Sequence, residues 1–320
     1  MSGDDWKPAA SRQVLAMRAQ LLARTRAFFE ARAVLEVDTP LLVNAAVTDV
    51  HLHCAQVRLE PQGATYYLHT SPEYAMKRLL ASGSGDIYQI CHVVRARERS
   101  RLHNAEFTLI EWYRLGFTLE ALMQEVEALA HALLEPVLAA PAERLSYAQL
   151  FARSLGLDPF ASPLAELAQA ARGLGYTAAQ ATRDELLDVL MAARIGPQLG
   201  HERLAFVHGY PASQAALARL DPCDSRCARR FELYGSGIEL ANGFEELADP
   251  AEQRARFESD RAERARRGEQ APASDERLLA ALAAGLPACA GVALGFDRLV
   301  MLACGARHID QVLAFPLERA

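Results

Sequence analysis

The stretch VVRARERSRLHNAEFTLIEWYR, from Val93 to Arg114, decides how this chain is expected to fold. A short apolar segment leads into a loop dense in charge, and a second segment combines aromatic with acidic side chains. This order predicts a β-hairpin, with Arg95 at the end of the first strand and His103 in the loop. Alternate side chains of a strand share one face, which here groups Phe107, Glu111 and Tyr113.

The residue types in this hairpin suit a nucleoside triphosphate. A guanidinium group can donate two parallel hydrogen bonds to phosphate oxygens, and the ring of Phe107 can stack on a base. A charge run by itself is more often a solvated hairpin tip. The functional interpretation therefore depends on a second segment, GVALGFDRLVML, from Gly291 to Leu302. It predicts an apolar strand, a glycine turn and a helix that begins near Asp297 and Arg298.

Together the two segments resemble motifs 2 and 3 of class II aminoacyl-tRNA synthetases. The resemblance implies an α+β fold with an antiparallel β-sheet flanked by helices, and ATP as a substrate. It implies that Arg95 and Arg298 are catalytic. The expected ATP-binding residues are these two and Arg97, Glu98, His103, Asn104, Phe107, Glu239, Leu240 and Gly295. The pattern departs from the family at Arg97, where a glutamate is usual, and we expect Glu98 to act instead.

Composition narrows the class of protein. A chain of 320 residues can bury a large core, and no apolar run is long enough to span a membrane. The first residues show no signal peptide, and six scattered cysteines favour reduced thiols in the cytoplasm. The net charge of −6 argues against a surface built mainly to hold nucleic acid. His51 and His53 share a strand face, but no third metal ligand is near them in the sequence.

The N-terminal region predicts a long helix from Ser11 to about Ala33, followed by the short strand VLEVD and by Thr39-Pro40. This order resembles motif 1, which builds the homodimer interface in the same family. An amphipathic helix that packs on its own core fits the pattern equally well.

The segment YYLHTSPEYAMKRLLASG, Tyr66 to Gly83, predicts a strand and then a helix with Ser71 as N-cap and Pro72 at its first position. Glu73 then lies in the first helical turn, where a carboxylate can simply complement the helix dipole. In the synthetase family a turn of this kind contacts the amino acid, so we expect Ser71, Pro72 and Glu73 to bind substrate, with Glu73 at the backbone-side ammonium.

Carboxylates cluster in RFELYGSGIELANGFEELAD, Arg230 to Asp249. So many acidic groups are costly near an ATP site unless they hold cations. We expect Glu232 and Glu239 to bind Mg²⁺, which prefers oxygen ligands, and Glu246 to bind a cationic substrate side chain. The alternative is an acidic surface loop.

GIELANGFEEL and HNAEFTLIEWYR are closely similar to the lysine-binding segments of lysyl-tRNA synthetases, which implies that Tyr113, Asn242 and Glu246 line a lysine pocket. The resemblance begins near Ser11, so we expect one catalytic domain over residues 1–320, with a helical insertion at about 140–200 and no anticodon-binding OB-fold. A catalytic domain of this kind resembles the free-standing relatives that attach (R)-β-lysine to a lysine of elongation factor P.

These expectations include a homodimer, no membrane association and no tRNA charging. Lysyl-tRNA synthetases usually carry a glycine where this chain has Ala293, and one methyl beside a substrate can change which isomer fits. Two alternatives remain open: a truncated lysyl-tRNA synthetase paralogue that activates α-lysine, and a non-catalytic regulatory paralogue.

Overall fold

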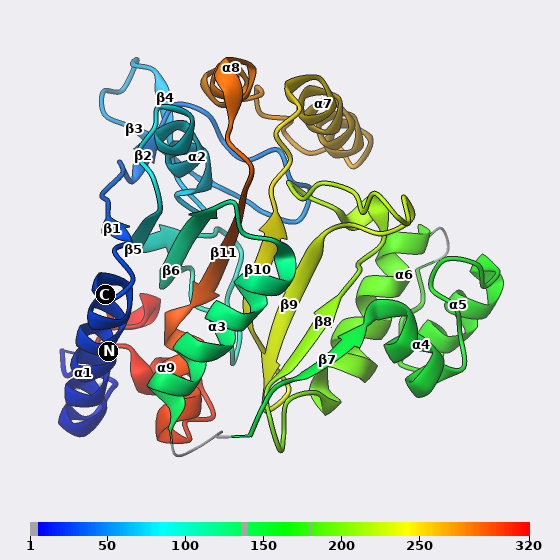
Figure 1. Ribbon diagram of the computed structural model, residues 1–320, viewed down its shortest axis with the longest axis horizontal. Coiled ribbons are helices and arrows are strands. Elements are labelled where there is room, and N and C mark those ends of the chain that lie inside the picture. The colour runs from blue at the N-terminus through cyan, green and yellow to red at the C-terminus, as the bar shows by residue number, and fades with distance from the viewer. Residues whose placement is uncertain (1–5, 136–139, 179–180) are drawn as a thin grey trace. The chain divides into compact units, whose positions relative to one another are not determined.

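The computed structural model describes residues 6–135, 140–178 and 181–320. The chain forms two compact units (Figure 1). The first unit comprises Met1–Phe117 and Leu247–Ala320, and the second comprises Thr118–Glu246. Each unit has its own strands and helices.

The first unit contains four neighbouring strands: β1 (Leu35–Glu36), β5 (Ile87–Val94), β6 (Glu106–Leu115) and β11 (Cys289–Gly295). β5 pairs antiparallel with β6, and β6 pairs antiparallel with β11. The predicted hairpin is therefore confirmed. β1 runs parallel to β5, so this sheet is mixed rather than wholly antiparallel.

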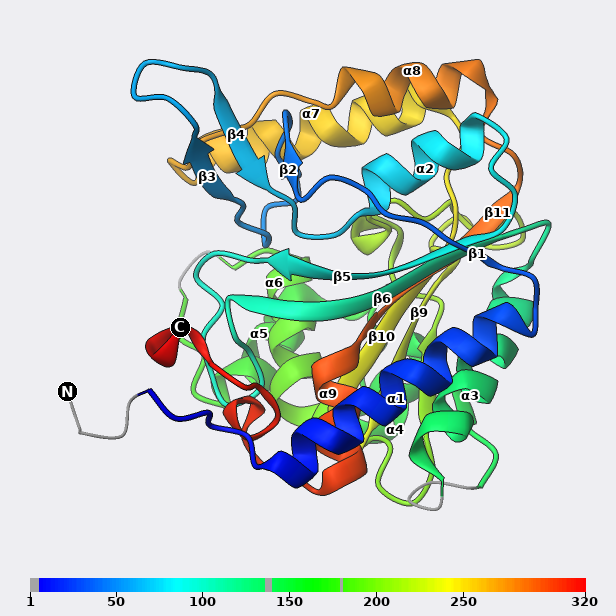
Figure 2. The same cartoon turned by 90° about the vertical axis from the view of Figure 1, so that its left-hand side faces the viewer.

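One face of these strands packs against α1 (Arg12–Glu30) and α9 (Phe296–Cys304) (Figure 2). Fully buried Phe29 of α1 stacks on Tyr88 at 4.3 Å and meets Trp112 edge-on at 5.3 Å. Aromatic contacts of this geometry add to the free energy of burial. The Ser11 side chain accepts a hydrogen bond from the Val14 amide and so caps the N-terminus of the predicted helix.

A second group of elements in the first unit consists of a small antiparallel sheet, ordered β2-β4-β3, and three helices. Their bounds are β2 (Leu42–Val43), β3 (Ala55–Arg58), β4 (Thr65–Leu68), α2 (Glu73–Ala81), α7 (Pro250–Arg266) and α8 (Glu276–Gly285). The prediction that Ser71 is the N-cap of α2 is wrong by one residue, since Pro72 takes that position. The Ser71 hydroxyl accepts from the Glu73 amide across the proline, and its own proton is used elsewhere.

The second unit contains strands in the order β10-β9-β8-β7, antiparallel except for the β7–β8 pair. Their bounds are β7 (Glu143–Ser146), β8 (Ala205–His208), β9 (Arg230–Gly235) and β10 (Ile238–Glu245). The carboxylates expected in a strand-to-loop segment instead lie mostly on β10, which continues to Glu245. The turn between β9 and β10 has Ser236 and Gly237 at positive φ.

The region expected to be a helical insertion, at about 140–200, lies within the second unit, which contains several helices. They are α3 (Leu119–Leu134), α4 (Tyr147–Leu155), α5 (Leu164–Arg172), α6 (Arg183–Leu190), the π-helix η1 (Met191–Ile195) and the 3₁₀-helices η2 (Gly196–Gln198) and η3 (Ala212–Gln214). Thr182 and Glu185 form a capping box at the start of α6. A common apolar core joins α4, α5 and α6 to β7 and β8. Residues 143–146 of the insertion form a strand, not a helix.

Two short 3₁₀-helices, η4 (Ile309–Val312) and η5 (Leu317–Arg319), end the chain. Within the described ranges, no helix has the length and apolar character needed to cross a membrane. All six cysteines are free thiols.

Candidate active site

The face of the first unit's strands opposite α1 carries Tyr113 and Ala293, two of the residues predicted to bind substrate. Glu111 and Tyr113 alternate along β6, and Ala293 of β11 pairs directly with Glu111. Directly paired residues of antiparallel strands point to the same side. The alternation predicted from the sequence therefore places Ala293 beside the acidic and phenolic groups.

Glu111 is a functional candidate that the sequence analysis did not assign. Its side chain is 2% exposed, and its two carboxylate oxygens accept hydrogen bonds from different elements. The Tyr113 hydroxyl donates to Oε1 at 2.8 Å, and the Ser71 hydroxyl donates to Oε2 at 2.7 Å. Ser71 Oγ in turn accepts from the Glu73 amide at 3.0 Å. A buried carboxylate thus connects β6 to the TSPE turn. The only signal in the sequence is a charged residue within an apolar strand.

Motifs 2 and 3 meet at His103 and Arg298. The Arg298 Nη2 atom lies 2.6 Å from His103 Nε2, and Ser100 Oγ lies 2.7 Å from His103 Nδ1. Burial, followed by the charges of Arg298 and Arg95, lowers the pKa of His103 to about 4. The ring is therefore neutral at physiological pH. Because Nε2 accepts from Arg298, the ring proton is on Nδ1 and is donated to Ser100.

Arg95, which directly follows β5, lies close to Phe107 of β6. The guanidinium carbon of Arg95 is 5.1 Å from the centre of the Phe107 ring, a cation–π distance. Its Nε donates to the Thr70 carbonyl at 3.3 Å, which ties the hairpin to the TSPE turn. The charge of Arg95 also lowers the pKa of His103, which contacts Arg298. Arg95, His103 and Phe107 therefore lie in one cluster with Arg298.

The remaining predicted residues of the motif 2 loop differ in exposure. Arg97 adopts a positive φ of 69°, and its side chain is 71% exposed, 3.8 Å from Glu269. Glu98 is half-buried. The buried Asn104 amide donates to the Glu106 carbonyl and accepts from the Leu317 amide, so its side chain maintains the loop. Direct ATP contacts by these three residues remain predictions.

Asp297, within motif 3, is buried, and its contacts support the fold. It is 1% exposed, pairs with Arg18 of α1 and accepts from the Thr108 amide at 2.7 Å. Gly295 precedes it as the N-cap of α9. These contacts fix the start of α9, and therefore the place from which Arg298 extends.

In the second unit, a β-bulge decides which residues share a face. Glu232 pairs with Asn242, and Tyr234 pairs with Glu239, with a register shift between Glu239 and Ala241. Leu240 is the extra, buried residue. An inserted residue changes the alternation, so Glu239 and Asn242 point to one side although they are three positions apart. Sequence spacing alone predicts opposite faces.

The Glu232 carboxylate is already held by neighbours on its own face. Arg230 Nη2 donates to Oε1 at 2.5 Å, and the Tyr234 hydroxyl donates to Oε2 at 2.6 Å. Among the residues that the structure describes, no group of three or more His, Cys, Asp or Glu side chains could hold a metal. Mg²⁺ commonly uses one or two carboxylates and completes its shell with phosphates and water. Binding of Mg²⁺ by Glu232 and Glu239 therefore remains a prediction.

Neighbouring Glu245 and Glu246 have different environments. Glu245 forms ion pairs with Arg219 and with Arg229 Nε, the latter at 2.9 Å, and it accepts from the Leu119 amide. Glu246 follows β10, is 6% exposed and has the same parity as Asn242. Glu245 therefore serves the fold of the second unit, which leaves Glu246 as the better ligand for a substrate cation.

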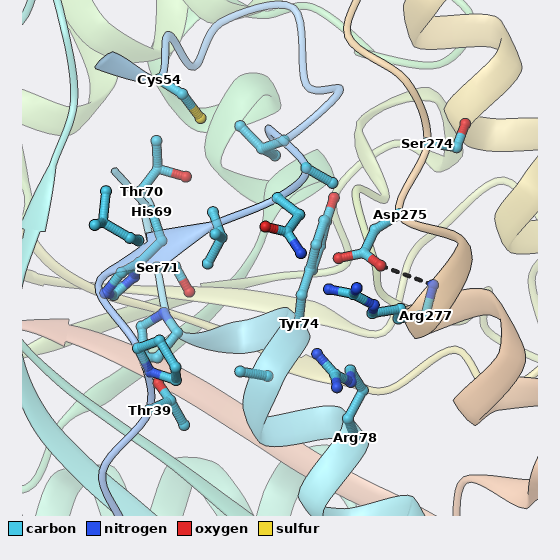
Figure 3. A pocket seen from close by; sticks show the side chains of 18 of the residues that line it. Thr39, Cys54, His69, Thr70, Ser71, Tyr74, Arg78, Ser274, Asp275 and Arg277 are labelled. Carbon is cyan, nitrogen blue, oxygen red and sulfur yellow. Dashed lines mark hydrogen bonds between the residues drawn. The ribbon is translucent and has the colours of Figure 1, made fainter. Parts of the chain in front are cut away.

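A pocket of about 470 Å³ lies beside the TSPE turn of the first unit (Figure 3). Tyr74 of α2 lines it, as do Asp275 and Arg277 at the start of α8. Of the residues predicted to bind substrate or ATP, only Ser71 and Pro72 are among those that line it. This pocket is therefore distinct from the cluster formed by Arg95, His103 and Arg298.

The contact between motifs 2 and 3 agrees with the family to which the sequence is similar. Residues 5–319 match the family described as "tRNA synthetases class II (D, K and N)", and the chain belongs to this family. The α+β class II fold expected from the sequence is thus confirmed. Curated relatives cover essentially the whole chain.

A protein from Vibrio cholerae serotype O1, named elongation factor P--(R)-beta-lysine ligase, is 49% identical over the full length of both chains. Proteins of the same name from Erwinia tasmaniensis and Klebsiella pneumoniae are 49% and 48% identical, and each alignment covers 98% of both chains.

Proposed function

We propose that this chain is an ATP-dependent ligase that activates (R)-β-lysine and attaches it to a lysine of elongation factor P. The observation that carries the proposal is the near-50% identity, over the whole length of both chains, to relatives of that name. The convergence of Arg95, His103 and Arg298 supports it, because a non-catalytic paralogue has no need to retain this arrangement.

In the first step, the β-lysine carboxylate attacks the α-phosphorus of ATP, and the bond to pyrophosphate breaks. Arg95 stabilises the charge that develops on the α-phosphate. Arg298, oriented by neutral His103, holds the γ-phosphate, and Phe107 stacks on adenine. The remaining residues of the expected ATP site, including Glu98 and Gly295, complete it.

In the amino acid site, Glu73 binds the ammonium nearer the substrate carboxylate, and Glu246 binds the side-chain ammonium with Tyr113 and Asn242. Glu232 and Glu239 hold Mg²⁺, which neutralises phosphate charge when it is bound. In the second step the ε-amine of a lysine on elongation factor P attacks the adenylate carbonyl. An amide bond forms, AMP leaves, and the amine proton passes to AMP or to water.

We also propose that the enzyme acts as a homodimer in the cytoplasm, where elongation factor P and ATP are found. The order of α1, a short strand and Pro40 resembles motif 1, which builds the homodimer interface in this family. Leu35, Leu41 and Leu42 of this region are 56%, 41% and 37% exposed. Native mass spectrometry that detects only a monomer at micromolar concentration would contradict the dimer.

The activity is tested by incubating the enzyme with ATP and labelled lysines, with either elongation factor P or total tRNA as acceptor. We expect efficient transfer of (R)-β-lysine to the protein and none to tRNA. ATP–pyrophosphate exchange with α-lysine, (R)-β-lysine and (S)-β-lysine identifies the isomer. Efficient charging of tRNA, with no label on elongation factor P, would instead support the truncated-synthetase alternative.

The isomer preference is expected to depend on Ala293. Its methyl group shares a face with Glu111, so Ala293→Gly should improve activation of α-lysine relative to β-lysine by about ten- to two-hundredfold. The measurement is the ratio of kcat/KM for the two isomers. Ala290→Gly makes the same change on the opposite face of β11 and should leave the ratio unchanged. Thermal stability is recorded for both variants, because glycine also loosens the strand. An unchanged ratio in Ala293→Gly would show that this methyl does not select the isomer.

A further inference from the structure

Lys77 of α2 is a buried lysine to which neither the fold nor the proposed reaction assigns a role. Its side chain is 1% exposed and is among the largest fully buried side chains of the described residues. Lysine is almost never buried to this extent unless it is paired. Removing an ammonium from water costs several kcal/mol, and apolar residues of similar volume often stabilise a fold equally well or better. A role in stability alone therefore explains Lys77 poorly.

The ammonium of Lys77 lies 2.8 Å from Glu73 Oε1, one helical turn away. The two residues differ in exposure: the Lys77 side chain is 1% exposed, whereas the Glu73 side chain is 16% exposed. The comparable pair on α7, Glu252 with Arg256, has its members 43% and 20% exposed. Such surface pairs contribute little to the stability of a helix. Because Lys77 is buried, its ion pair with Glu73 differs from a surface pair that only stabilises a helix. We therefore consider an effect of Lys77 on Glu73 itself.

Glu73 is constrained from two directions. Its amide donates to Ser71 Oγ, which donates to Glu111, so the backbone of Glu73 is tied to the acidic cluster on β6. The Lys77 ammonium lies against Oε1, so the side chain of Glu73 is held as well as its backbone.

We propose that Lys77 is a positioning residue: it holds the Glu73 carboxylate in the orientation that receives the ammonium nearer the carboxylate of the amino acid substrate. This inference rests on the proposed function, and it adds that specificity for the amino group is set partly by a residue that does not touch the substrate. Lys77 acts through Glu73, so its effect must depend on Glu73.

The test is ATP–pyrophosphate exchange by the full-length enzyme with (R)-β-lysine as the probe. Lys77→Met should raise KM for β-lysine by about ten- to a hundredfold, the range typical of groups that orient a ligand-binding side chain. KM for ATP should stay within about twofold of wild type. Arg78→Met is the matched control, since Arg78 is the exposed neighbour on the same helix, and it should leave both values unchanged.

A double-mutant cycle separates positioning from a general structural role. Lys77→Met combined with Glu73→Gln should be no worse than Glu73→Gln alone, because Lys77 has nothing left to orient. Lys77→Gln, which removes the charge and leaves only a shorter donor that falls short of Glu73, is the second variant if Lys77→Met fails to fold, and it should also show a selective rise in KM for β-lysine. Equal effects on both substrates, or additive losses in the double variant, would overturn the proposal.

The wild-type measurement separates a failure of the proposed function from a failure of the role proposed for Lys77. If wild type exchanges pyrophosphate with β-lysine and Lys77→Met has an unchanged KM, only the role of Lys77 is overturned. If wild type exchanges with none of the lysine isomers, the proposed function is overturned, and the role of Lys77 falls with it.

Discussion

Replacing Arg298 with alanine is expected to lower kcat/KM for ATP in pyrophosphate exchange by about a thousandfold. A guanidinium that holds transferring phosphates typically contributes an effect of this size. The Arg298 side chain reaches His103 and the Leu102 carbonyl, so its position is fixed before ATP binds. The substitution should leave KM for the amino acid much less changed than KM for ATP.

The matched control for this substitution is Arg307→Ala. Arg307 is exposed just beyond the end of α9, and its replacement removes the same charge from the same part of the chain. We expect wild-type exchange from this variant. If Arg298→Ala retained more than about a tenth of the wild-type kcat/KM for ATP, motif 3 would not bind the triphosphate in the way proposed here.

Local patterns made part of this site predictable. The hairpin and the turn before α9 depend on neighbours a few residues apart, and both are confirmed. Family resemblance supplied what the patterns could not, because Arg298 and His103 are 195 residues apart. No periodicity in the sequence indicates that contact.

The features that the sequence did not predict depend on strand pairing and on hydrogen bonds that join separate segments of the chain. Ser71 was expected to cap α2, yet its hydroxyl proton goes to Glu111, 40 residues away. The face of Glu239 depends on the bulge at Leu240, which only strand pairing reveals. The same limit hid Glu111 itself, since its role becomes visible only when Ser71 and Tyr113 are seen to donate to it.

Glu246→Gln is expected to abolish useful activation of β-lysine while leaving ATP binding nearly intact. A substrate ammonium that loses its buried ionic partner typically loses roughly 3 kcal/mol or more, equivalent to at least about a hundredfold in kcat/KM. Glu246 is 6% exposed, so solvent cannot replace the carboxylate. The measurements are pyrophosphate exchange with varied β-lysine and, separately, ATP binding by calorimetry.

Glu245→Gln is the control that makes this result specific, because it places the same substitution on the adjacent residue. Its carboxylate is paired with Arg219 and Arg229, so the change should lower thermal stability and leave KM for β-lysine near the wild-type value. The reverse pattern, with normal activation in Glu246→Gln and a large rise in KM in Glu245→Gln, would transfer the lysine-binding role to Glu245. Those two arginines would then have to release Glu245 when the substrate binds.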